Sequence, residues 1–289
     1  MRSLPIGESA VALCIDGAAP QATSDRMRAV AAAVANAALP GMDDIVSSPG
    51  RVTVSADPLR IEDAAAFRAA VVAAAERASE AAPVPAAMHE IPVAYDGPDL
   101  DDLCGRHGIA RDAFIALHAE PDYRVEAVGF LPGFGYLGGL PQRLATPRRA
   151  TPRARVLAGS VGIGGGQTGV YPFASPGGWN LIGRSPVRLF DVTRPQPSLL
   201  AVGDRVRFIE ADVAPADESP STIGSTWTNG RRVSITVVHP GLFTTVQDLG
   251  LRGHRGSGVP LSGAADALAM RLARSEEHTS ELQSRQYLV

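Results

Sequence analysis

Hydrophobic positions in the first third of the chain alternate between helix-like and strand-like spacing. Residues 24–39 and 62–81 are alanine-rich with apolar residues three and four positions apart, and each run ends close to a proline, which predicts two helices. Segments 6–15, 51–56 and 89–95 have the alternating or continuous apolar character of strands. We interpret the order as β-α-β-β-α-β, for which a split-βαβ, ferredoxin-like sandwich is the simplest packing.

The pattern changes after this part. Residues 100–107 and 111–119 predict two short helices, with Gly108 suited to the C-terminal turn of the first. From Tyr123 onward, short apolar runs are separated by glycine and proline clusters, and no helical period returns. This texture predicts a β-barrel or sandwich that closes near residues 202–209.

A stretch of small and polar residues with two prolines then marks an interdomain linker, because such a composition cannot form a core. A new strand-like unit starts at Val233. The predicted class is α+β. We expect an N-terminal α+β domain (1–93), a β-barrel domain (94–210), a linker (211–232), the truncated start of a second β-rich domain (233–273) and a non-native end (274–289).

The last of these ranges is unlike protein sequence. Residues 274–284 read RSEEHTSELQS and resemble, residue for residue, the in-frame translation of a common sequencing-adapter oligonucleotide. We therefore expect residues 274–289 to be adapter read-through and the biological sequence to stop near Ala273. This range is left out of the fold prediction.

Composition narrows the class of protein. With 45% hydrophobic and 20% charged residues in 289, the chain can bury a core and is long enough for about two domains. No apolar run approaches the ~20 residues of a membrane span, and the N-terminus lacks a secretory signal pattern. Cys14 and Cys104 have no neighbouring cysteine. We expect a cytoplasmic protein without a membrane partner.

Charge excludes further classes. All 27 basic residues are arginines, so the chain has no lysine for a Schiff base, a phosphate-binding P-loop, a kinase active site or covalent biotin. Any biotin must arrive on another protein. The net charge is −3 and the arginines are scattered, which argues against a nucleic-acid partner, since that needs a concentrated basic face.

Candidate chemistry concentrates in residues 129–186, where prolines and glycines make rigid loops that carry arginines and aromatic residues. Guanidinium groups bind carboxylate or phosphate at two points, glycine amides form anion nests, and aromatic rings supply walls. We therefore predict a site for a small anion, with the alternative that these residues only turn the corners of the barrel. The candidate binding residues are Arg148, Arg149, Arg153, Arg184, Tyr136, Tyr171, Trp179, Gly164, Gly165 and Gly166.

Several other motifs are rejected. Gly164, Gly166 and Gly169 match GxGxxG, but prolines follow where a dinucleotide-binding helix would begin. No GxSxG elbow occurs, and the histidines lack metal-ligand spacing, so no metal site is predicted. His118 ends a short helix, where ligand contact, proton transfer and a purely local role all remain open.

Ordered motifs carry a family resemblance. Over roughly residues 5–210, and most strongly from His118 to Phe208, the chain resembles the family of the 5-oxoprolinase B subunit, also called KipI-type or allophanate hydrolase subunit 1. Residues 233–250 and 258–266 resemble the opening of the companion C subunit, a KipA-type, biotin-dependent carboxyltransferase-like family. Leu157 and Ser185 depart from the pattern of the B subunit. The motifs are GFLPGFGYLGGLP (129–141), AGSVGIGGGQTGVYP (158–172), SPGGWNLIGRSPVRLFD (175–191) and VGDRVRF (202–208).

The resemblance implies a ferredoxin-like domain followed by a cyclophilin-like β-barrel. It also implies ATP-dependent opening of 5-oxoproline to glutamate, with ATP and Mg²⁺ as cofactors and no biotin attached to this chain. The implied partners are the 5-oxoprolinase A subunit and the remainder of the domain that resembles the C subunit, and we expect this truncated chain to be inactive alone.

The resemblance also implies roles for the candidate residues. The arginines would clamp phosphate or carboxylate, and Tyr136, Tyr171 and Trp179 would form the walls. Gln167 and Thr168 would donate to the substrate amide or its oxyanion, since charge develops there during lactam opening. His118 is included as a possible proton-transfer group.

Two further functions are compatible with the resemblance. One is the carboxyltransferase half of a urea-carboxylase-like system, which would use carboxybiotin delivered in trans. The other is a KipI-like inhibitor of a sensor histidine kinase. Fusion to a companion domain favours an enzyme, because a standalone inhibitor gains nothing obvious from that covalent link.

Overall fold

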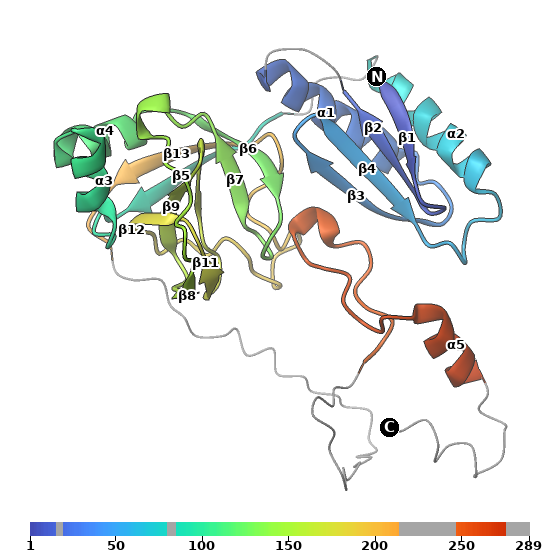
Figure 1. The fold of residues 1–289 in the computed structure, drawn as a ribbon. Helices are drawn as coiled ribbons and strands as arrows, with labels where there is room; N and C mark the ends of the chain where they lie inside the picture. Colours follow the sequence, from blue (N-terminus) through green and yellow to red (C-terminus); the bar gives the residue numbers. More distant parts are fainter. Residues whose placement is uncertain (16–19, 80–84, 214–246, 276–289) are drawn as a thin grey trace, which may run out of the picture. The chain divides into compact units, whose positions relative to one another are not determined.

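The computed structural model describes residues 1–15, 20–79, 85–213 and 247–275. The chain forms two compact units, of which the first comprises residues 1–219 and 253–259 and the second the remainder. Most of the predicted linker, the first part of the region after it and nearly all of the adapter-like end lie outside the described residues (Figure 1). Each unit is considered by itself below.

The N-terminal part of the first unit is a four-stranded antiparallel sheet with the order β1-β2-β4-β3. Helices α1 and α2 cover one of its faces (Figure 1). Alternate residues of the central strands point toward these helices and are fully buried, among them Leu13, Val52 and Val54. The elements are β1 (Arg2–Ile6), β2 (Ala10–Cys14), α1 (Pro20–Asn36), β3 (Met42–Ser48), β4 (Arg51–Ala56) and α2 (Ala64–Glu76).

Local sequence explains these elements. Asp63 caps α2, because its carboxylate accepts hydrogen bonds from the amides of Ala65 and Ala66, which satisfies two of the free donors at a helix start. Phe67 and Val71 then recur on one face of the helix and pack into the core above the sheet. The two predicted helices are therefore present, with both starting and ending points shifted from the predicted ones.

The split βαβ arrangement is present, since β4 lies between β2 and β3. Two strand predictions are corrected. Residues 6–15 do not form one strand, because Gly7 takes a left-handed φ of 58° and begins the turn between β1 and β2. Strand β5 (Met88–Val93), expected to complete this sheet, pairs instead with β13 of the second sheet, and β1 occupies the edge beside β2.

The second sheet is a nearly closed, seven-stranded barrel with the order β12-β9-β10-β7-β6-β13-β5. Its two edge strands meet at an isolated bridge between Ala94 and Arg184. The predicted barrel is therefore observed. It also contains β5, the strand that was expected in the N-terminal sheet. Its other strands are β6 (Tyr123–Val128), β7 (Gly135–Gly138), β9 (Ser160–Gly164), β10 (Gln167–Val170), β12 (Asn180–Arg184) and β13 (Arg205–Glu210).

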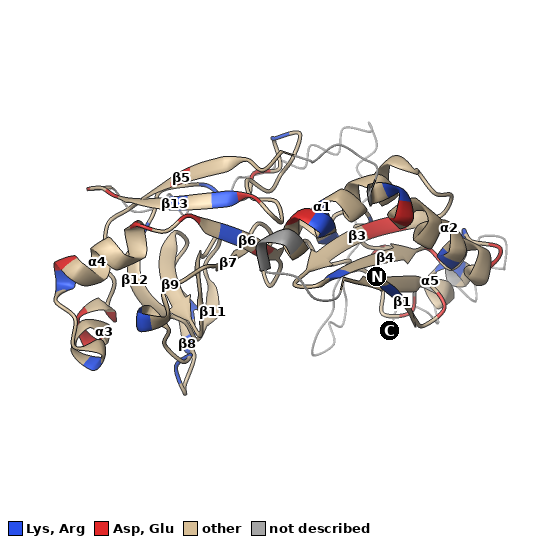
Figure 2. Cartoon of the chain, turned by 90° about the horizontal axis from the view of Figure 1, so that it is seen from above, with Lys and Arg blue, Asp and Glu red and all other residues tan. Residues whose placement is uncertain are grey.

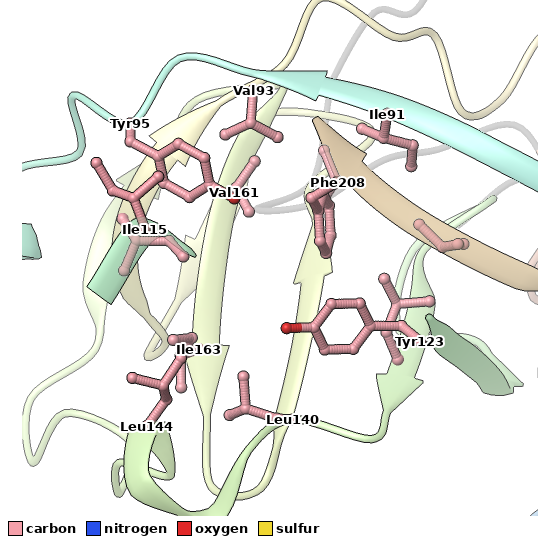
Figure 3. Close-up of a cluster of buried hydrophobic side chains, with 14 of the residues drawn as sticks. Ile91, Val93, Tyr95, Ile115, Tyr123, Leu140, Leu144, Val161, Ile163 and Phe208 are labelled. Carbon is pink, nitrogen blue, oxygen red and sulfur yellow. The ribbon is translucent and has the colours of Figure 1, made fainter. Parts of the chain in front are cut away.

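Side chains fill the inside of the barrel (Figure 3). Tyr95, Tyr123, Val161, Ile163 and Phe208 point into this core. The predicted helices α3 (Leu100–His107) and α4 (Arg111–Ala119) are confirmed and contribute to the same core. As predicted, Gly108 ends α3 in the left-handed conformation.

A small two-stranded sheet, β8 (Arg153–Val156) with β11 (Ser175–Gly177), extends from the barrel. Short 3-10 turns occur at Arg77–Ser79, Gln142–Leu144 and Arg255–Ser257. In the second unit, the described residues include α5 (Ala267–Ser275) and a turn in which Leu251 donates to the carbonyl of Leu261.

None of the helices in the described residues is long and apolar enough to cross a membrane. Arginines and acidic residues are scattered over the helices and strands of the described chain (Figure 2). Many are paired with each other, as in the contact of Arg106 with Asp102 on α3.

Candidate functional site

A cavity of about 270 Å³ opens between the loops at one end of the barrel. Its residues come from the loop before β7, the arginine-bearing loop before β8, and the turn between β11 and β12. Its size suits a metabolite rather than a drug-sized ligand, because sites for the latter run from about 300 to 1,000 Å³. The lining residues are Phe130, Phe134, Tyr136, Arg148, Arg149, Pro152, Tyr171, Pro176, Gly177, Gly178 and Trp179.

The walls of the cavity are aromatic. The ring of Phe134 meets those of Tyr136, Tyr171 and Trp179 edge to face, with centroids 4.9, 5.3 and 5.4 Å apart. Such geometry stabilises an aromatic cluster beyond the area that it buries. Phe134, Tyr171 and Trp179 belong to a hydrophobic cluster separate from the interior of the barrel, so the cavity has a rigid floor of its own.

Arg148 supplies positive charge to this cavity. Its guanidinium carbon lies 5.9 Å from the centroid of the Trp179 ring, within the range of a cation–π interaction. Among the residues that the structure describes, no carboxylate pairs with Arg148. An exposed guanidinium held over an aromatic ring is therefore available to an anionic ligand.

The neighbouring arginines are held by a buried acid. Asp99, just before α3, accepts from Arg149 at 3.1 Å and from Arg153 at 2.7 Å. Its second oxygen accepts from the backbone amide of Leu181 at 2.6 Å. Asp99 compensates one of these two positive charges and fixes their loop to β12, so the pair keeps a net positive charge beside Arg148.

Backbone contacts also fix the loop that carries Arg148. The amide of Arg149 donates to the carbonyl of Gly178 at 2.7 Å, and the Asn180 side chain donates to the carbonyl of Pro147. A Cβ on Gly177 would lie 2.6 Å from the hydroxyl oxygen of Tyr171, so this turn can pack on the aromatic wall only with glycine. This close approach explains the first glycine of the SPGGW motif.

The two tyrosines of the cavity stay neutral at physiological pH. Burial raises the pKa of Tyr136 and of Tyr171, and the nearby Arg148 only partly opposes this effect. Arg148 therefore remains the principal charge that a ligand meets, while the tyrosines offer ring surface and hydroxyl groups.

His118 lies inside the barrel instead of at the cavity. Its ring is fully buried, accepts from the Tyr95 hydroxyl at Nδ1 (2.8 Å) and contacts Thr168 Oγ1 through Nε2 (2.9 Å). Thr168 donates its own proton to the carbonyl of Gly162, so Nε2 of His118 must carry the hydrogen. Burial lowers the pKa of His118 to about 3, which keeps the ring neutral.

The structure places His118 and Thr168 away from the cavity lining, and the roles expected for them on a ligand stay predictions. Both side chains are completely buried, and each polar atom of their network already has a partner within the barrel. We therefore assign them to the barrel core.

Other candidate residues also lie outside the cavity lining. Gln167 donates to the Glu126 carboxylate at 2.7 Å, and Arg184 pairs with Asp96 at the opposite end of β12 from Trp179. Gly165 and Gly166 form the exposed β9–β10 turn, where the Gly165 amide donates to the carbonyl of Thr146. Gly164 packs against Trp179.

The structure thus brings together some of the predicted residues and separates the rest. Arg148, Arg149, Tyr136, Tyr171 and Trp179 line one cavity, and Arg153 joins them through Asp99. The expectation that Arg184 and Gln167 share this cavity is not met. Ligand roles for the lining residues remain predictions.

The candidates left out Asp99 and six of the lining residues, among them two aromatic ones. Phe130 and Phe134 lie within the motif GFLPGFGY, and the alternation of rings with glycines there could have identified them. Asp99 stands in an acidic run before α3 and gave no signal, because only the fold brings it to Arg149 and Arg153, some fifty residues later.

Comparison with known proteins shows consistent similarities. The family described as "Carboxyltransferase domain, subdomain C and D" matches residues 1–200. The B subunit of 5-oxoprolinase from Haemophilus influenzae is 57% identical over 123 residues, covering 42% of this chain and 58% of that protein. The chain thus spans little more than half the length of this relative.

Solved structures agree in fold. The crystal structure of TTHA0988 is 38% identical with a TM-score of 0.64, covering 72% of this chain and 41% of that one. Urea carboxylase of Kluyveromyces lactis is 18% identical with a TM-score of 0.55, covering 73% of this chain and 22% of that one. At this identity the second likeness concerns the fold alone.

Proposed function

Since this chain belongs to the family of carboxyltransferase-domain subdomains C and D, and resembles the B subunit of 5-oxoprolinase, we propose that it is a component of an ATP-dependent 5-oxoprolinase. In this proposal it binds 5-oxoproline in the Arg148 cavity while the lactam is opened to glutamate. The observation that carries the proposal is the guanidinium of Arg148, held over Trp179 without a carboxylate partner among the described residues.

The chemistry of 5-oxoproline matches the cavity. The molecule has nine non-hydrogen atoms, one carboxylate and a small, nearly flat ring, and a cavity of about 270 Å³ accommodates it. Its carboxylate would pair with Arg148 at two points. Its ring would lie against Trp179 and Tyr136, both of which line the cavity.

The carbonyl carbon of a lactam resists attack by water, so the carbonyl oxygen has to be activated before the ring opens. ATP, when bound, supplies the phosphoryl group for this activation. The residues of this chain orient the substrate and hold its carboxylate, and the aromatic walls limit access of water. We propose that ATP and Mg²⁺ bind on the A subunit and that the Arg148 cavity holds the small carboxylate substrate.

The partners in this proposal are the A subunit and a complete C subunit. Family membership also supports a second candidate, a carboxyltransferase that uses carboxybiotin delivered by another protein. The absence of lysine from the sequence requires that the biotin be attached elsewhere. The same cavity would then take the acceptor of the carboxyl group.

The test is reconstitution of this chain with the A subunit and a complete C subunit. We expect ATP hydrolysis that depends on 5-oxoproline and produces glutamate in equal amount. Omission of this chain should abolish that activity. Carboxyl transfer from carboxybiotin to an acceptor, without 5-oxoproline-dependent ATP hydrolysis, would replace the proposal with the second candidate.

A further inference from the structure

A short segment from late in the sequence packs into the first unit. Residues 253–259 belong to this unit, although the residues on either side belong to the second. Two glycines let its backbone approach closely. A Cβ on Gly256 would lie 2.9 Å from the carbonyl oxygen of Ile45 on β3, and one on Gly258 would lie 2.6 Å from that of Leu131.

The segment is fastened to β3 through Asp44. The Asp44 carboxylate, whose side chain is only 3% exposed, accepts from the amides of Gly253 and Arg255 at 3.0 Å each and from Arg255 Nε at 2.9 Å. Arg255 also donates to Ser55 Oγ at 2.8 Å. Three donors from one segment, two of them backbone amides and one a charged guanidinium, make charge-assisted hydrogen bonds to this carboxylate, and such bonds are stronger than neutral ones and favour the docked state.

The other side of the segment holds the loop of the cavity. The carbonyl of Ser257 accepts from the amide of Gly133 at 2.9 Å. This loop, residues 129–135, carries Phe130 and Phe134 to the cavity. The segment thus links Asp44 on the N-terminal sheet with the loop that forms one wall of the cavity.

Phe130 in this loop adopts an unfavourable backbone conformation. Its φ is 71°, a left-handed value that costs a bulky residue free energy and persists only where neighbouring structure imposes it. Its side chain is 58% exposed yet meets the rings of Phe134 and Tyr171 edge to face at 5.6 and 6.4 Å. Phe130 therefore forms an exposed rim of the cavity.

We infer that residues 253–259 are a positioning segment for the ligand cavity, in which docking of Arg255 on Asp44 holds the 129–135 loop so that Phe130 closes one side of the site. The region that resembles the C subunit would thereby control the shape of a binding site built from the barrel that resembles the B subunit. The ligand part of this inference rests on the proposed function. The docking part rests on geometry alone.

The test uses the full chain and hydrogen–deuterium exchange. In Arg255→Ala, we expect the Gly133 amide and residues 253–259 to exchange about 10-fold faster or more, because the bonds that hold them are lost. Strand β9 should keep its protection. Gly258→Ala should produce the same effect through backbone collision, and Arg106→Ala, which removes an exposed ion pair, is the matched control without effect.

A second measurement is the affinity for 5-oxoproline, determined by calorimetry. We expect Arg255→Ala to weaken binding by about 3- to 10-fold, with Arg106→Ala unchanged. If residues 253–259 lose protection while the Gly133 amide keeps it, or if neither changes, the positioning role is overturned. If the Gly133 amide loses protection and the wild-type chain binds no 5-oxoproline, positioning stands and the proposed substrate is wrong.

Discussion

Aromatic rings surround a polar side chain at two places, the interior of the barrel and the cavity. In the interior the polar side chain is hydrogen-bonded to protein groups, whereas at the cavity it has no carboxylate partner among the described residues. Inside, His118 stacks on Phe208 with ring centroids 4.7 Å apart, and both of its nitrogens bond to protein groups. At the cavity, Arg148 lies over Trp179 without a carboxylate partner in the described part of the chain.

This difference separates a structural polar group from a binding group. In the interior, the polar atoms of His118 and Thr168 are already hydrogen-bonded to protein groups and are not available to a ligand. Removing one of these side chains would leave its buried hydrogen-bond partners unsatisfied. In the part of the chain that the structure describes, the main cation of the cavity lies over an aromatic ring and has no carboxylate partner. Aromatic rings surround a neutral, buried imidazole in one place and an exposed guanidinium in the other, so burial and hydrogen bonding decide which group can bind a ligand.

The largest effect is expected from breaking the interior network. His118→Ala should lower the free energy of unfolding by roughly 3–5 kcal/mol, because it leaves a void and removes the partners of Tyr95 and Thr168. Urea denaturation measures this change. His107→Ala is the control, since that partly exposed ring contributes one bond, to Thr146, and should cost about 1 kcal/mol. Equal losses of unfolding free energy in both variants would show that the interior network stabilises the fold no more than the single hydrogen bond of His107.

The next effect tests the unpaired cation. Arg148→Ala should reduce kcat/KM of the reconstituted complex by about 100-fold, or ~2.7 kcal/mol, because a two-point contact with a carboxylate is lost. Stability should barely change, since Arg148 is exposed and has no ion pair within the described residues. Arg143→Ala, an exposed arginine outside the cavity lining, should retain activity. Full activity in Arg148→Ala would exclude Arg148 from the binding site.

Acidic pH should lower the free energy of unfolding through the buried His118. The unfolded chain protonates His118 near its ordinary pKa of about 6.5, whereas the folded chain does so only near pH 3. Stability from this residue is therefore full above pH 6.5 and falls as the pH drops toward 3, with a loss of roughly 2 kcal/mol between pH 7 and pH 5. Urea midpoints at both pH values, compared with those of His118→Gln, isolate this component. An unchanged pH dependence in the variant would contradict the neutral, buried ring.

Sequence patterns predicted the parts of the structure that depend on local chemistry. Helices α3 and α4 followed from spacing and from Gly108, and the barrel followed from its Gly and Pro texture. Strand β5 was recognised as a strand but given the wrong partner. Pairing depends on which sheet edge is free, and the unforeseen β1–β2 hairpin had already occupied that edge.

The same limit applies to the site. Glycines and aromatic residues spread over three motifs predicted a shared wall, and Tyr136, Tyr171 and Trp179 do share it. The candidate arginines could not be ranked, because an arginine with a carboxylate partner and one without look alike in sequence. Asp99 and Asp96 decide the ranking, and only the fold shows which arginines they contact.

The smallest effect is expected at Arg184, which the sequence placed with Arg148 as an anion clamp. Arg184→Ala should change kcat/KM by less than about 2-fold and stability by less than ~1 kcal/mol, because its pair with the half-exposed Asp96 is a surface ion pair. Arg148→Ala measured in the same complex is the matched comparison. A loss at Arg184 as large as that at Arg148 would mean that the substrate reaches the far end of β12, and the distinction between paired and unpaired arginines would no longer locate the site.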